Sequence, residues 1–94
     1  LNKEAIRKIT DLKIQELIKR FSEKGYKINV DKEVRIYISE SAFDPNFGAR
    51  PIRKLIAKNI ESLFSEKILN DDFSVGDEID IKLIDKKIII EKHR

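Results

Sequence analysis

The stretch FDPNFGARPIRK, residues 43–54, separates two segments with helical patterns in this 94-residue sequence. Asp44-Pro45 ends the segment before it, because the residue that precedes a proline is disfavoured in the helical region. Pro51 suits the first position of the next helix, where its missing N–H group is not needed. The stretch therefore predicts a break near Asp44 and a new helix from Pro51.

The segment after Pro51 has the clearest helical pattern in the chain. Charged side chains such as Arg53, Lys54 and Lys58 fall on one side of it. The opposite side is apolar and recurs with the helical period, at Ile52, Leu55, Ile56, Ile60, Leu63, Phe64 and Ile68. We expect one long helix from Pro51 to about Asn70, with this apolar side in the core.

Two more helices are expected before this stretch, over residues 2–23 and about 32–41. Asn2 and Asp31 are the expected N-cap residues, and Gly25 is expected to end the first helix. Ion pairs are expected at the i,i+4 spacings Glu4–Lys8 and Glu16–Arg20.

Alternating apolar residues predict three strands. The first is YKINV, residues 26–30, and the other two form a hairpin within residues 74–92 with a turn at Asp85-Lys86. The hairpin must pair with residues 26–30, because an isolated two-stranded ribbon is marginally stable. We expect an α+β fold of about three helices packed on one face of a small three-stranded sheet, with residues 1–94 as a single domain.

Composition excludes several classes of function. Charged residues make up 39% of the chain with mixed signs and a net charge of +3, which argues against a nucleic-acid surface. Cysteine is absent, so thiolate metal sites are excluded. The aliphatic run at residues 88–90 is too short to span a membrane. The chain begins with Leu1 and contains no Met, so we expect a piece of a longer protein or a processed product.

No catalytic site is visible in the chain by itself. There is no Ser-His-Asp set, and no glycine-rich P-loop. The one histidine, His93, is expected in a frayed tail without partners, and Asp71-Asp72 is expected to be solvated. We expect no metal site and no enzyme activity from this chain alone.

Gly48-Ala49-Arg50-Pro51 is the strongest candidate site. The free N–H groups and positive dipole of a helix start, a glycine and a guanidinium suit a phosphate oxygen. On this motif alone, pairing of Arg50 with Asp44 to hold the loop is the favoured interpretation.

Two neighbouring features also allow either a functional or a structural interpretation. Phe43 and Phe47 suit base stacking, but filling the seam between the second and third helices is favoured. Lys54 and Lys58 suit a basic ridge, for which a solvated helix face is the better interpretation. A small RNA-binding module that uses this ridge and the sheet is the alternative from another class of function.

The stretch resembles the Clp family of two-module AAA+ chaperones, in which a D-P-x-x-G-A-R-P segment marks the start of the sensor 2 helix. The resemblance extends over nearly the whole chain and is strongest to the ClpB disaggregases, through EKGYKI and NIESLFSEKIL. ClpC-type unfoldases, which feed a Clp protease, share most of the pattern. One departure is Ala42, where the family usually has Gly, which would cost about 1 kcal/mol in a left-handed conformation.

The resemblance implies the C-terminal small subdomain of the second ATPase module, with the Walker motifs in a large subdomain outside this sequence. Arg50 would be the sensor 2 arginine that reaches the γ-phosphate of ATP, with Mg bound through the large subdomain. Gly48 and Ala49 would lie beside the nucleotide, and Ile9 near the adenine. The implied partners are neighbouring protomers of a homohexamer and unfolded or aggregated polypeptides, with no nucleic acid and no membrane, in the cytoplasm or an organellar matrix.

Overall fold

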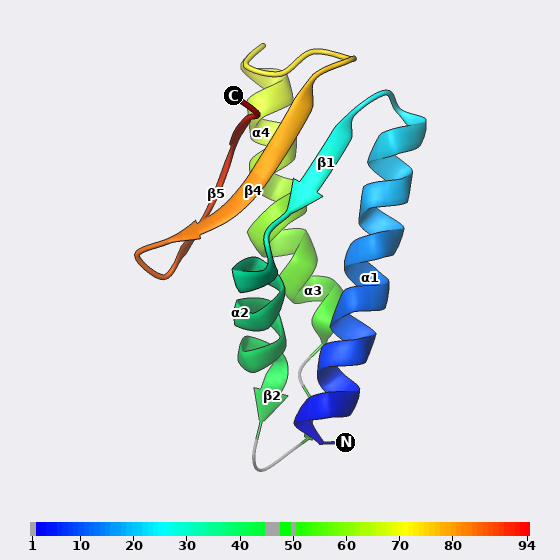
Figure 1. The fold of residues 1–94 in the computed structure, drawn as a ribbon, viewed down its shortest axis with the longest axis vertical. Coiled ribbons are helices and arrows are strands. Elements are labelled where there is room, and N and C mark those ends of the chain that lie inside the picture. The colour runs from blue at the N-terminus through cyan, green and yellow to red at the C-terminus, as the bar shows by residue number, and fades with distance from the viewer. Residues whose placement is uncertain (1, 45–47, 50) are drawn as a thin grey trace.

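The computed structural model describes residues 2–44, 48–49 and 51–94, with side chains at 2–43 and 51–94. The chain folds as predicted, into helices packed on one small sheet (Figure 1). In chain order the elements are α1 (Lys3–Glu23), β1 (Lys27–Val30), α2 (Lys32–Ala42), β2 (Phe43–Asp44), β3 (Gly48–Ala49), α3 (Ile52–Ile56), η1 (Ala57–Glu61), α4 (Ser62–Leu69), β4 (Glu78–Ile84) and β5 (Lys87–Lys92).

The sheet has the strand order β1-β4-β5. β1 pairs parallel with β4, from Lys27 opposite Glu78 to Val30 opposite Ile81. β4 and β5 form an antiparallel hairpin, and its turn residues Asp85 and Lys86 have φ angles of 51° and 62°. The predicted pairing of the hairpin with the strand near residues 26–30 is therefore confirmed.

The core lies between the sheet and the helices on one of its faces. α1 flanks β1, and the helical stretch α3–η1–α4 runs behind β4 and β5 (Figure 1). The predicted apolar side of this stretch is the buried one. Its most buried residues are Ile52, Ile56, Ile60 and Phe64.

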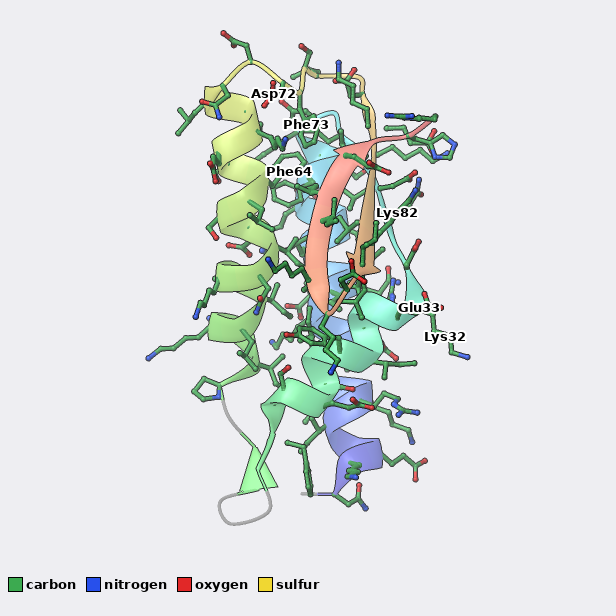
Figure 2. All side chains as sticks on the ribbon, turned by 90° about the vertical axis from the view of Figure 1, so that its left-hand side faces the viewer. Lys32, Glu33, Phe64, Asp72, Phe73 and Lys82 are labelled. Atoms are coloured by element: carbon green, nitrogen blue, oxygen red, sulfur yellow. The ribbon has the colours of Figure 1, made fainter. Side chains whose placement is uncertain are left out.

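Phe64 is at the centre of an aromatic cluster that joins the long helical stretch to the rest of the fold. Its ring stacks on Phe21 of α1 with 4.2 Å between centroids, and meets Tyr26 edge-on at 5.0 Å. Phe73, from the loop before β4, lies 5.7 Å away. Figure 2 shows Phe64 and Phe73 on the inner side of the sheet, whereas Lys82 lies on the side away from α4.

The ends of α1 have the predicted signals. The Asn2 side chain accepts a hydrogen bond from Ala5 N at 2.8 Å, and Glu4 pairs with Lys8 at 3.8 Å. Gly25 follows the helix with a φ of +96°, and a Cβ atom there would lie 2.6 Å from Val75 Cγ1. Glycine is therefore needed at this position for both its conformation and its size.

One predicted ion pair was wrong, and two predicted helix starts differ from the structure only in detail. Arg20 pairs with Glu61 of η1 rather than with Glu16, which instead lies 3.5 Å from Lys13. Asp31 occupies the N-cap position of α2, but its side chain makes no capping hydrogen bond. Pro51 is the N-cap of α3 rather than its first residue, a difference of one position.

The tail at His93 is not frayed as expected. Its backbone N–H donates to Glu78 O at 2.8 Å, and its ring Nδ1 lies 2.8 Å from Asp80 Oδ2. The chain therefore stays hydrogen-bonded to β4 for one residue beyond the end of β5.

The long helical stretch contains a π-helical turn, η1, that the sequence pattern did not predict. The Asn59 side chain donates to Leu55 O at 2.8 Å, and Ser62 Oγ donates to Lys58 O at 2.6 Å. A wider turn leaves carbonyl groups without their usual partners, and side chains such as these satisfy them. Within the described ranges, no helix is long and apolar enough to cross a membrane.

We predict that Phe64→Ala lowers the free energy of unfolding by about 3–5 kcal/mol, because it removes the ring at the centre of the cluster and leaves a cavity. Leu69→Ala on the same helix is the matched control, since Leu69 is 83% exposed, and should change stability by less than about 0.5 kcal/mol. Urea unfolding measures both. Equal effects would contradict this description of the core.

Candidate functional site

The elements around the FDPNFGARPIRK stretch meet at one end of the molecule. The N-terminal end of α1, β2 and the start of α3 lie together at this end (Figure 1). Lys3 Nζ lies 5.3 Å from the centroid of the Phe43 ring, which joins the first turn of α1 to β2 by a cation–π contact. We call this region the α1–β2–α3 end.

A short antiparallel ladder leads into α3, which the sequence did not predict. Phe43 pairs with Ala49 and Asp44 with Gly48. Two-residue strands have no hydrophobic period to detect, so only tertiary context could have identified them. The ladder fixes the backbone direction of Gly48 and Ala49 just before the long helical stretch begins.

The structure shows where some of the predicted site residues lie and leaves others outside its described ranges. Ile9 is partly buried and packs against the core from α1. Gly48 and Ala49 are described by their backbone pairing only. Arg50 and its expected pairing with Asp44 lie outside what the structure describes, and so does Phe47. Contact of these residues with a nucleotide stays a prediction.

Phe43 and Ala42 have structural roles. Phe43 packs against the core, which agrees with its predicted role in the seam. Ala42 is fully buried as the last residue of α2 and has no positive φ. Alanine therefore causes no strain here, and the cost considered for a left-handed conformation does not apply.

A cleft of about 510 Å³ lies between α1 and the α3–η1 segment. Lys13, Arg20 and Arg53 line it, together with the carboxylates of Glu16 and Glu61. Arg20 and Lys13 are paired with these two carboxylates. The charges in the cleft are thus nearly balanced, and the cleft does not select for a ligand of one sign.

Neither the predicted basic ridge nor the outer sheet face resembles an RNA platform. Lys54 and Lys58 are both exposed on the long helical stretch, as expected for a solvated helix face. The outer face of the described sheet carries Lys27, Asn29, Glu78, Asp80, Lys82, Ile84, Lys87, Ile89, Glu91 and His93. This face has carboxylates and no Phe, Tyr or Trp, whereas RNA-binding sheets stack bases on aromatic rings.

Comparison with known proteins identifies the class. Residues 1–81 match the family model of the C-terminal, D2-small domain of ClpB protein. The match includes α1, β1, α2, the α1–β2–α3 end, the long helical stretch and the first four residues of β4. The fold thus defines a class of protein: a small α+β domain in which a short ladder leads into a long helical stretch.

The chain belongs to the ClpB D2-small domain family. It is 36% identical over 86 residues to the chaperone protein ClpB of Oceanobacillus iheyensis, covering 92% of this chain and 11% of that protein. It is 33% identical over 79 residues to ClpB 1 of Thermosynechococcus vestitus, covering 84% and 9%. The similarity to chloroplastic ClpC4 of Oryza sativa subsp. japonica is 35% over 72 residues, covering 77% and 8%. The chain thus spans about a tenth of the length of these relatives.

We predict that the 94-residue chain does not bind a single-stranded RNA oligonucleotide in a gel-shift assay at low salt, where phosphate contacts are strongest. The physical reason is that the outer face of the sheet carries carboxylates among its lysines and has no Phe, Tyr or Trp on which bases could stack. A shifted band that weakens steeply with added salt, and is lost in Lys54→Ala/Lys58→Ala, would revive the RNA-binding alternative.

Proposed function

We propose that this chain is the nucleotide-sensing small subdomain of the second ATPase module of a ClpB-type ATP-dependent disaggregase. Its membership of the D2-small family carries the proposal, together with Gly48-Ala49-Arg50-Pro51 at the start of the long helical stretch. Arg50 would contact the γ-phosphate of ATP that the large subdomain holds. Gly48, Ala49 and Ile9 would border the nucleotide.

The local backbone supports an anion at this end. The chain passes from the β2–β3 ladder to α3 through Pro51, which has a φ of −59°. α3, η1 and α4 follow one another without a break from Ile52 to Leu69. The first N–H groups of such a stretch have no helical partner and give its start a partial positive charge, which favours an anionic oxygen.

The packing supports transmission of a signal from this end. The helical stretch from Ile52 to Leu69 is on the order of 27 Å long at 1.5 Å per residue, and α1 and the sheet hold it along this length. Close-packed interiors deform little, so a pull at the start of α3 would turn the whole subdomain. A guanidinium that binds a γ-phosphate more tightly than the product state would make this rotation depend on the nucleotide.

The partners follow from this role. The large subdomain of the same protomer would supply the Walker residues and Mg. Neighbouring protomers of a homohexamer would receive the rotation and transmit it to loops that pull on unfolded or aggregated polypeptide. The cytoplasm or an organellar matrix would be the compartment, and one similar protein is named as chloroplastic ClpB3 of Arabidopsis thaliana.

A ClpC-type unfoldase that feeds a Clp protease is the second candidate. The 35% identity to chloroplastic ClpC4 favours keeping it, because it is as high as the identity to several ClpB proteins. The domain would work in the same way in both, and a protease-docking loop in the large subdomain would distinguish them.

We predict that Arg50→Ala in the intact parent protein lowers ATP turnover, or its coupling to unfolding, by about 10²-fold, because one charge-assisted contact to the transferring phosphoryl group is lost. Arg50→Lys should restore only part of it, since lysine keeps the charge but not the planar fork. Steady-state phosphate release and refolding of an aggregated substrate measure these effects.

Lys58→Ala is the matched control, because Lys58 is exposed on the same helical stretch and should leave turnover unchanged. The thermal midpoint of the 94-residue chain with Arg50→Ala should stay within a few degrees of the unmodified chain. Normal stimulated turnover in the intact Arg50→Ala protein would refute the sensor role.

We also predict that the 94-residue chain alone releases no phosphate from MgATP above the rate of a buffer blank, because the residues that would activate water and hold Mg belong to the large subdomain. A coupled phosphate assay tests this directly. Turnover that persists through repurification would contradict the division of roles between the subdomains.

A further inference from the structure

We propose that Glu78, Asp80 and His93, with Asn29 as a fourth ligand, form a Zn²⁺-binding site on the outer face of the sheet. One ligand atom from each of the first three residues lies within 4.8 Å of the others. The site is separate from the α1–β2–α3 end, and the proposal does not depend on the nucleotide-sensing role.

The strand register brings the four side chains to one face. Glu78 and Asp80 are two residues apart on β4 and point to the same side of the sheet. Asn29 of β1 lies directly opposite Asp80. His93 follows β5, and its backbone N–H donates to Glu78 O at 2.8 Å, which holds the imidazole beside the two carboxylates.

The distances suit a small ion. His93 Nδ1 lies 2.8 Å from Asp80 Oδ2 and 3.9 Å from Glu78 Oε2. Ligand atoms around a tetrahedral zinc ion with bonds of about 2.1 Å are separated by about 3.4 Å, which lies between these two values. Shifts of well under 1 Å would bring the two His93 distances to this value, and the Glu78 and Asp80 ligand atoms, which lie within 4.8 Å of each other, would approach by up to about 1.4 Å.

Asn29 completes the set by a simple rotation. Its Nδ2 donates to Glu78 Oε2 at 2.7 Å and to Asp80 Oδ1 at 2.9 Å. Turning the amide by about 180° replaces this donor with the Oδ1 acceptor at the same place. Turned this way, the amide presents an oxygen ligand beside both carboxylates in place of a donor.

Charge and exposure also favour a cation. Glu78 and Asp80 both contribute carboxylates, which supply the negative charge that a cation needs. The exposed fractions of the three ligand side chains rise from 13% at Asp80 to 33% at Glu78 and 48% at His93. Asp80 therefore forms the buried side of the cluster, and an ion can reach the cluster from solvent at the His93 side.

Neighbouring lysines do not block the site. Lys27 Nζ is 3.8 Å from Glu78 Oε2, but its side chain is 73% exposed and free to move away. Lys82 is held by Glu91 at 3.0 Å, and Lys92 by Asp77 at 3.6 Å. An imidazole among the ligands selects Zn²⁺ over Mg²⁺ and Ca²⁺, which prefer oxygen ligands alone.

The test is a titration of the 94-residue chain with ZnCl₂ near neutral pH, measured by calorimetry and by thermal shift. We expect saturable binding of one ion per chain, a rise in thermal midpoint by mass action, and no response to MgCl₂. His93→Ala and Asp80→Asn should each weaken binding at least about tenfold, a loss that even outer-shell partners of a metal can cause.

Two further variants test whether zinc binding depends on these particular ligands. Glu66→Gln is the matched control, because Glu66 is exposed on α4, away from this face of the sheet, and it should bind zinc like the unmodified chain. Asn29→Asp should lower the thermal midpoint without metal, since it adds a third carboxylate, and should show a larger rise with zinc. No saturable binding, or binding that His93→Ala and Asp80→Asn leave unchanged, would overturn the proposal and leave the cluster as a hydrogen-bond network.

Discussion

The fold depends on burial of one apolar side of the helical stretch from Ile52 to Leu69. Within it, Phe64 is 1% exposed and contacts aromatic rings from α1, from the residue before β1 and from the loop before β4. Two parts of the chain that are distant in sequence, residues 21–26 and 64–73, thus meet at one buried ring. Burial of a large apolar side chain contributes about 1.5–3 kcal/mol, and aromatic pairs add about 0.5–1.5 kcal/mol beyond the area that they bury, so this cluster has more weight than an aliphatic contact of the same area.

This constraint also determines what each end of the domain is free to do. The aromatic cluster is at the end of α1 marked by Phe21, whereas the β2–β3 ladder and the start of α3 are at the other end (Figure 1). The two regions are joined by helices that the core holds along their length. In the proposed role, the α1–β2–α3 end would contact another subdomain without loosening the core, and a displacement there would move the sheet with it.

Much of the fold was predictable from sequence because its signals are local. Periodicity located all of the main helices, and the turn at Asp85-Lys86 has the left-handed conformation that a tight hairpin needs. The partner of Arg20 was not predictable, because Glu16 on its own helix and Glu61 on another are equally charged and only packing decides between them. The π-helical turn was missed for a related reason, since one wider turn hardly changes the spacing of the apolar residues.

The two candidate sites also differ in how well the sequence alone indicates them. Gly48-Ala49-Arg50-Pro51 is contiguous, so sequence alone indicates it. Asn29, Asp80 and His93 come together only through the pairing of β1 with β4 and β4 with β5. An isolated histidine near the end of a sequence does not indicate which side chains will lie beside it. The tail was also expected to be frayed.

The register of the parallel pair is what gives the outer face its chemistry. Ile28 and Val30 face the core on either side of Asn29, and Ile79 and Ile81 flank Asp80 in the same way. Slipping β1 by one residue would turn Asn29 inward and expose two apolar side chains, at a cost that the core does not permit. The same burial that positions the helices therefore fixes the amide between the two carboxylates, so the geometry of the proposed zinc site follows from the core rather than from the site residues themselves.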